Sequence, residues 1–166
     1  MSTRISACLV ISLSVAACSC GSRSEASAAV VSFAEALADS DYVTAWELLT
    51  PASQERYEAA ADVLLEFGWI EAGPVLAGAA PSITEQMFGQ LDGFMLFEAT
   101  VSAAPQSFEL STSVKSVSYP DSGLAVVVLR TGDGLQEVEA RRAADGQGWL
   151  VDLSTLEPPL QEAPGE

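Results

Sequence analysis

Cysteines supply the most reactive side chains in this sequence, because it contains no histidine. Cys8 lies in an uncharged, mostly apolar run at 5–17, Cys18 follows that run directly, and Cys20 comes two residues later. A cysteine thiolate is a nucleophile that can be acylated or oxidised. Without histidine, Ser-His-Asp and Cys-His catalysis and imidazole ligation of metals are excluded. Lys115 is the only lysine, and no serine stands three residues before it, so a Ser-x-x-Lys nucleophile is missing as well.

The apolar run at 5–17 is typical of a secretory signal peptide. It follows one basic residue, Arg4, and is well short of the ~20 apolar residues that span a bilayer. Its end, Val15-Ala16-Ala17-Cys18, resembles the bacterial lipobox. The resemblance implies cleavage between Ala17 and Cys18, with a diacylglyceryl group on the Cys18 thiol and a further acyl chain on its freed amine. A plain signal peptide with a chance cysteine is the alternative.

The remaining cysteines predict a domain without disulfides. Cys8 leaves with the signal peptide and Cys18 is acylated, so Cys20 has no intramolecular partner. Cys20 could be a second lipidation site, an intermolecular crosslink or a thiol with no role. The polar stretch at 18–24 is expected to tether the domain, at 25–154, to its lipid.

Acidic residues dominate the charge of the chain. Seven basic and 23 acidic residues give a net charge of −16, and removal of 1–17, whose only charged side chain is Arg4, leaves −17. Nucleic-acid binding is therefore excluded, because it needs Lys and Arg to replace counterions on phosphates. The same charge predicts that the domain stands off an anionic bilayer rather than lying on it.

Helical periodicity runs through 25–67. Asp41 and Thr50, the latter followed by Pro51, are expected to cap a second and a third helix after a break at 39–41. The segment 68–105 is hard to assign because glycines and prolines interrupt it, although 82–97 could be helical. The expected inward stripes contain Val30, Val31, Phe33, Ala34 and Leu37 in the first helix, and Tyr57, Ala60, Ala61, Leu64 and Leu65 in the third.

The period changes to two from residue 106, which predicts antiparallel strands to 154. Phe108, Leu110, Val114, Val117 and Tyr119 alternate with polar residues. The segment 124–130 is almost continuously apolar, so we expect a central strand covered on both faces. Turns at 132–134 and 145–148 predict hairpins, and the Pro- and Glu-rich tail at 155–166 is expected to be disordered.

Helices followed by a meander predict an α+β fold. The segments at 33–37 and 41–51, together with the ending Gly148-Trp149-Leu150-Val151-Asp152, resemble nuclear-transport-factor-two-like domains of bacterial lipoproteins. This resemblance implies N-terminal helices packed on a curved antiparallel sheet, in a cone whose open end can be a pocket. Residues 68–105 depart from it, because that family usually has strands there.

Enzymes of that fold place carboxylates, His or Tyr in the pocket, which makes Tyr42, Tyr57, Tyr119 and Asp152 the residues to consider. None of them has a catalytic spacing, and we interpret Asp152 as a solvated strand carboxylate. Catalytic residues, metal ligands and cofactors are therefore not assigned. The three tryptophans, Trp46, Trp69 and Trp149, could line a ligand pocket, but Trp46 and Trp149 are more simply core residues.

Asp39-Ser40-Asp41 lacks the glycine and downstream glutamate of a calcium loop, and is interpreted as a helix break with a cap. Gly132-x-Gly134 and Gly146-x-Gly148 lack the next glycine of a phosphate loop.

The expected function is that of a lipid-anchored envelope protein whose domain binds a small apolar ligand or another envelope protein without catalysis. The alternative is an isomerase- or cyclase-type enzyme that uses Asp, Glu and Tyr. Ser19 after the lipidated cysteine is not an Asp-type retention signal, so in a cell with two membranes we expect the outer one, with the domain in the periplasm. Oligomeric state, ligand and pathway are not specified by the sequence.

Overall fold

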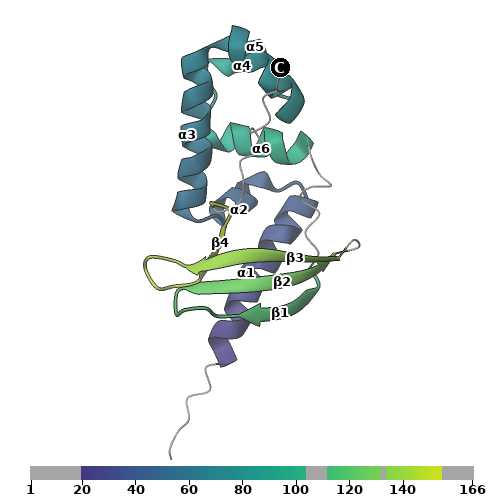
Figure 1. Ribbon diagram of the computed structural model, residues 1–166, viewed down its shortest axis with the longest axis vertical. Coiled ribbons are helices and arrows are strands. Elements are labelled where there is room, and N and C mark those ends of the chain that lie inside the picture. The colour runs from purple at the N-terminus through teal and green to yellow at the C-terminus, as the bar shows by residue number, and fades with distance from the viewer. Residues whose placement is uncertain (1–19, 104–111, 132–133, 155–166) are drawn as a thin grey trace, which may run out of the picture.

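The computed structural model describes residues 20–103, 112–131 and 134–154 (Figure 1). Within these residues six helices precede a four-stranded antiparallel sheet, so the predicted α+β class is confirmed. The helices are α1 (Cys20–Ala38), α2 (Tyr42–Glu47), α3 (Pro51–Phe67), α4 (Trp69–Ala79), α5 (Glu85–Phe88) and α6 (Gly93–Ala103). The strands are β1 (Val114–Ser118), β2 (Leu124–Thr131), β3 (Gly134–Arg142) and β4 (Trp149–Asp152).

The second and third helices begin where the sequence predicts, and the first begins earlier. Asp41 accepts a hydrogen bond from the backbone N–H of Thr44 at 3.1 Å and caps α2. Thr50 accepts one from the N–H of Ser53 at 3.2 Å and caps α3, with Pro51 in the first turn. Helix α1 begins at Cys20, so the residues at 20–24 of the expected tether are helical.

The segment from 69 to 103, where the sequence suggests a helix only at 82–97, is helical throughout most of its length. In place of one helix at 82–97 it has α5 and the start of α6, with a break between them. Two glycines stand inside these helices at points where a larger side chain would collide with a neighbour. A Cβ at Gly93 would lie 2.6 Å from Cγ of Glu58 and 2.7 Å from its backbone N, so only glycine lets α6 approach α3 here. A Cβ at Gly73 would lie 3.2 Å from the ring of Trp69. Packing between helices therefore decides a segment whose local propensities are weak.

The sheet is a meander in the order β1-β2-β3-β4. The turn at 145–148 forms as predicted, with positive φ at Gly146 and Gly148, and β2 pairs with β3 on either side of the predicted hairpin turn, whose residues 132–133 lie outside the described residues. Phe108, Leu110 and the tail at 155–166 also lie outside them.

Strand β2 is central, but the prediction that it is covered on both faces was wrong. Ala125, Val127 and Leu129 are buried, whereas Val126 and Val128 on the other face are partly exposed. They pair with Ser118 and Glu139, and with Ser116 and Glu137, so polar neighbours rather than a second layer flank them. This alternation of buried and partly exposed positions is typical of an antiparallel sheet with one face exposed to solvent.

The described residues form two hydrophobic cores. The first lies between the inner face of the sheet and α1, α2 and α6, with Phe33, Leu49, Phe97 and Val151 fully buried. The second lies among α3, α4, α5 and α6 and contains Leu64, Leu76 and Leu96. We call residues 51–103, with these four helices, the helical arm; it rises away from the sheet (Figure 1). Helix α6 contributes to both cores and joins the two parts.

Candidate functional site

The end of β4 meets the start of α3, and local backbone pairing brings them together. Leu49 forms a parallel bridge with Val151, through hydrogen bonds from the N–H of Thr50 to the carbonyl of Val151 (2.9 Å) and from the N–H of Val151 to the carbonyl of Leu48 (2.8 Å). This bridge covers part of the β4 edge that β3 leaves free. It also places the capping turn of α3 directly over Asp152.

Asp152 is buried, with 3% of its surface exposed, and its carboxylate is saturated with hydrogen bonds. Its Oδ1 accepts from the backbone N–H of Ser154 (3.0 Å) and from the Ser154 hydroxyl (2.5 Å), and lies 3.3 Å from the Ser53 hydroxyl and 3.4 Å from the Thr50 hydroxyl. Its Oδ2 accepts from Nε of Arg141. The prediction of a solvated strand carboxylate was therefore wrong. Asp152 projects from the outer face of the sheet, as a solvated residue would, but α3 covers it there.

The hydroxyl protons of Thr50 and Ser53 can be assigned from geometry. The two oxygens are 2.8 Å apart, and Ser53 Oγ also accepts from the backbone N–H of Leu153 at 2.8 Å. Each hydroxyl has a single proton. The shortest contacts are satisfied when Thr50 donates to Ser53 and Ser53 donates to Asp152. The helix cap and the strand carboxylate thus form one network.

Hydrogen bonds from Ser154 and Arg141 hold the Asp152 carboxylate in its charged form. Burial is the largest single influence and raises the pKa of Asp152, but hydrogen bonds from Ser154 and Arg141 together outweigh it and leave that pKa below its ordinary value of 3.8. The hydrogen bond to Asp152 also raises the pKa of Arg141, whose side chain is 46% exposed and lies 3.5 Å from Glu139. In this ion pair Asp152 is therefore buried, whereas Arg141 is partly exposed to solvent.

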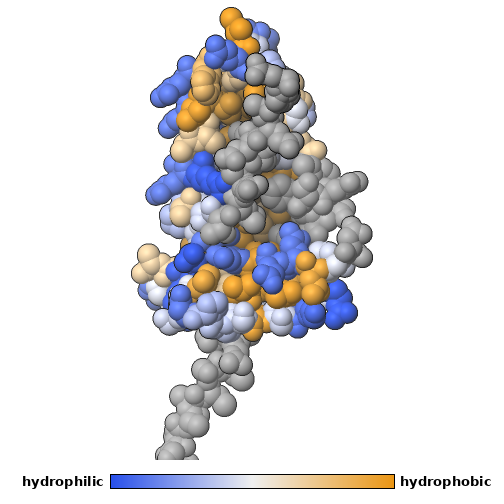
Figure 2. Space-filling view, in the orientation of Figure 1, coloured by the Kyte–Doolittle hydropathy of each residue, from blue (hydrophilic) through white to orange (hydrophobic). Residues whose placement is uncertain are grey.

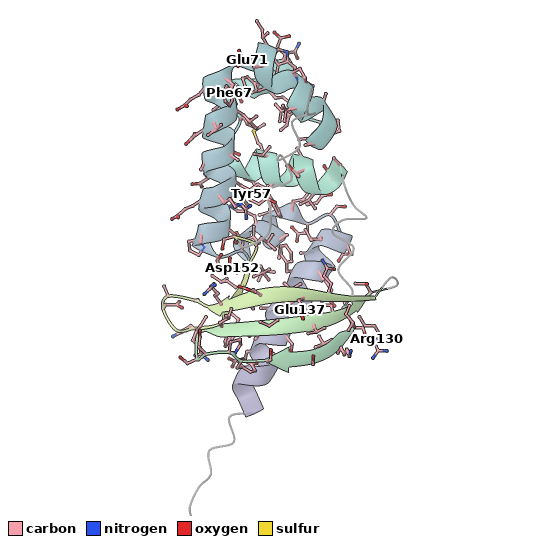
Figure 3. The ribbon with its side chains drawn as sticks, viewed as in Figure 1. Tyr57, Phe67, Glu71, Arg130, Glu137 and Asp152 are labelled. Atoms are coloured by element: carbon pink, nitrogen blue, oxygen red, sulfur yellow. The ribbon has the colours of Figure 1, made fainter. Side chains whose placement is uncertain are left out.

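Arg56 binds the backbone directly after β4. Its Nη1 donates to the carbonyls of Leu153 (3.1 Å) and Ser154 (2.6 Å). Together with the Asp152 network, this links the first two turns of α3 to residues about a hundred positions later. Figure 3 shows Asp152 between the sheet and the helices above it.

This arrangement stabilises the fold rather than performing acid–base chemistry. A general acid or base at neutral pH needs a pKa near that pH and an oxygen free to meet a substrate. Asp152 has a lowered pKa, and both its oxygens are occupied by protein donors. Ser53 and Thr50 face this carboxylate, whose lowered pKa makes it a weak base for their protons.

The tyrosines predicted as candidates lie in different packing environments. Tyr57 makes edge-on contacts with Phe97 at 5.4 Å and Trp46 at 6.1 Å between ring centroids. Burial raises the pKa of its hydroxyl to about 12, against a smaller lowering by Arg56. Tyr42 and Tyr119 pack on the first core, and the Tyr119 ring contacts Trp149 at 5.7 Å.

The tryptophans predicted as core residues do pack on the core. Trp149 is buried, and Trp46 lies against the same cluster. Within the described part of the chain Nε1 of Trp149 has no hydrogen-bond partner, while the guanidinium of Arg142 lies over its ring at 5.3 Å. Trp69, which the sequence could not place, packs on Phe88 in the second core.

The calcium-like segment at 39–41 is a helix break and cap, as predicted. Ser40 takes a positive φ of 57° there. Across residues 20–103, 112–131 and 134–154, His, Cys, Asp and Glu side chains form no group of three that could hold a metal ion.

Sequence reasoning missed two features. It found Thr50 only as a cap, and gave no reason to join Thr50, Ser53 and Arg141 to Asp152. It also missed the exposed apolar residues Phe67 and Ile70, which flank the end of α3 at Gly68. Helical periodicity is interrupted there, so the sequence does not show which of these side chains point outward.

The predicted lipobox, Val15 to Cys18, and the signal peptide lie outside the described residues. In the described part no helix combines the length and apolar character needed to cross a bilayer. Comparisons of the chain with protein-family models, curated proteins and solved structures found no match.

Proposed function

We propose that this chain is a lipoprotein, anchored through Cys18 to the cell envelope, whose domain binds another molecule without catalysing a reaction. One observation carries the non-catalytic part of the proposal. All four buried polar or charged side chains of the described residues, Thr50, Ser53, Thr100 and Asp152, make hydrogen bonds inside the protein. No buried titratable group among them is left over for acid–base catalysis.

Sequence features support the anchor. An uncharged run too short to span a bilayer ends in Val15-Ala16-Ala17-Cys18. Two or more acyl chains on one cysteine hold a protein stably, whereas one does not. The net charge of −17 after cleavage keeps the domain off anionic headgroups. With Ser19 after the cysteine, the proposed location in a cell with two membranes is the outer membrane, facing the periplasm.

The nuclear-transport-factor-two-like arrangement is likewise a proposal. Its support is the order of helices before a meander, with α1 packed on one face of the sheet. The helices α4, α5 and α6 stand where that family usually has strands, and the arm rises from the sheet instead of closing over it. The resemblance therefore applies to α1, α2 and the sheet better than to the arm.

Intact-mass measurement of the membrane fraction tests the anchor. The expected protein begins at Cys18 and carries a diacylglyceryl group and an additional acyl chain. Cys18→Ala is expected to remain unacylated and to keep residues 1–17, whereas the matched Cys20→Ala variant is processed like the unaltered chain. An unaltered chain without acyl groups, or acylation that follows Cys20 instead, would overturn the proposal.

A further inference from the structure

Exposed apolar side chains gather on the outer end of the helical arm. Eight large apolar side chains are exposed among the described residues, and five of them lie in the arm: Val63, Phe67, Ile70, Val75 and Met87. Figure 2 shows apolar surface at this end, next to strongly hydrophilic side chains. Apolar side chains that gather on the surface of a soluble domain mark contact sites, whereas single ones are normal.

Three of these residues stand in or next to the turn between α3 and α4, and we call Val63, Phe67 and Ile70 the apolar corner. Val63 and Phe67 are one helical turn apart on α3. Gly68 then ends the helix with φ 77°, and Ile70 stands in the first turn of α4. Phe67 is 61% and Ile70 is 90% exposed, so both side chains contribute little to the packing of the core.

The neighbours of the apolar corner show that its exposure is not a failure to pack. Leu64 and Trp69, which alternate with these residues along the chain, point into the second core, where Trp69 contacts Phe88. The inner side of this corner is therefore filled by other side chains. Phe67 and Ile70 are left facing outward on a well-packed support.

Exposed acidic residues stand next to the apolar corner in the sequence. The helical arm contains one basic residue, Arg56, and eight acidic ones, which gives it a net charge of −7. Exposed Asp62, Glu66 and Glu71 adjoin the three apolar residues in sequence. Figure 3 labels Glu71 and Phe67 at the same end of the arm, far from Asp152. Arg56 is bonded at the other end of α3 and does not neutralise this rim.

On the basis of the proposed binding function, we propose that the apolar corner docks a segment of another protein whose apolar side chains are flanked by Lys or Arg. An apolar centre with a charged rim is the usual layout of a protein interface, and charge complementarity selects the partner. A second copy of this chain would bring two arms of charge −7 together. An anionic lipid surface would repel the same carboxylates.

A synthetic amphipathic peptide of leucine and lysine is a direct probe of this surface. Binding is measured by calorimetry to residues 18–166 carrying Cys18→Ser, which contain every residue that the structure describes. A peptide of leucine and glutamate with the same apolar pattern is the control. The cationic peptide is expected to bind, with an affinity that falls as salt is added, and the anionic one is not.

Paired variants separate the apolar and acidic contributions. Phe67→Gln with Ile70→Gln is expected to weaken binding by about tenfold or more, as for central interface residues. The matched control, Val114→Gln with Leu135→Gln, changes exposed apolar residues of the sheet and is expected to bind as the unaltered protein does.

Removing two rim charges with Glu66→Gln and Glu71→Gln is expected to lower the affinity and its dependence on salt. Glu35→Gln with Glu137→Gln removes the same charge from exposed positions elsewhere and is expected to change neither. All these residues are exposed, so thermal unfolding is expected to stay unchanged and to show that each variant is folded.

Several outcomes would overturn the proposal. These are no binding of the cationic peptide, equal binding by the Phe67 and Ile70 variant, or equal effects of the two charge-removing pairs. Sedimentation that shows a dimer lost with Phe67→Gln and Ile70→Gln would identify a second copy as the occupant. Binding of phosphatidylcholine vesicles through the same residues would identify a lipid surface.

This docking surface and the lipid anchor can fail separately. Acylation of Cys18 with no peptide binding at the apolar corner would refute only the docking surface. Peptide binding without acylation would refute only the anchor.

Discussion

Replacement of Asp152 by Asn tests whether the network at the start of α3 holds the two parts of the molecule together. The amide keeps one acceptor oxygen but turns the other position into an N–H donor, which would face Nε–H of Arg141 or force Arg141 into solvent. Ser154 and the Ser53–Thr50 hydroxyls would also lose a charged acceptor.

The expected loss follows from the burial of the two charged partners. Hydrogen bonds to a charged group contribute about 1.5–3 kcal/mol each, and breaking a buried ion pair costs about 3–5 kcal/mol. Arg141 is 46% exposed and can recover hydration, which lowers its share. We therefore expect Asp152→Asn to reduce the free energy of unfolding by about 2–3 kcal/mol, or the Tm by roughly 5–10 °C.

The dependence on pH gives a second readout. Because folding lowers the pKa of Asp152, acid favours the unfolded state, which binds the proton more strongly. The stabilisation is fully present above the ordinary pKa of 3.8 and declines as the pH falls towards the lower folded value. The stability difference between the unaltered protein and Asp152→Asn is therefore expected to shrink below pH 3.8.

Urea denaturation of both proteins between pH 3 and pH 7 measures these effects. Asp121→Asn is the matched control, because Asp121 is exposed and its hydrogen bond from the N–H of Gly123 can be accepted equally well by Asn. If Asp152→Asn changed stability no more than Asp121→Asn at pH 7, or if the difference persisted unchanged in acid, the assignment of Asp152 as a charged structural anchor would be refuted.

Three further substitutions probe the helix contact, the aromatic cluster and the cap. Gly93→Ala is expected to destabilise the protein by about 2 kcal/mol in urea, because its Cβ would meet the backbone of Glu58, whereas Gly89→Ala, with no atom within 4 Å, is expected to be neutral or stabilising; equal effects would contradict the close contact. Folding raises the pKa of Tyr57 to about 12, so its contribution is complete below pH 10 and is lost as the pH rises towards 12. Tyr57→Phe is therefore expected to flatten the fall of Tm above pH 10, and an unchanged profile would contradict the burial of that hydroxyl. Thr50→Ala is expected to lower stability by about 1–2 kcal/mol and Thr50→Ser by much less, since Ser keeps the capping oxygen; similar losses would mean that the cap contributes little.

Local signals account for the part of the fold that the sequence predicted. Asp41 and Thr50-Pro51 are start signals that act within three residues, so the helices they begin are recognisable without knowledge of the rest. Alternating residues and Asp-Gly turns identify the strand pairs in the same way. Helices α4 and α6 were hard to predict because Gly73 and Gly93 weaken the local helix propensity, while their lack of a side chain permits close contacts with Trp69 and Glu58.

The sequence by itself determined the α+β order, the caps, the hairpins, the strong negative charge and the expectation of lipidation at Cys18. Tertiary structure alone decided that Asp152 is buried, since the residues that bury it lie about a hundred positions earlier in the chain. It also decided which apolar side chains stay exposed: Trp69 and Ile70 are adjacent in sequence, and only the packing of α4 turns one inward and leaves the other outward. Periodicity describes one face of one element at a time, whereas burial depends on what a second element brings to that face.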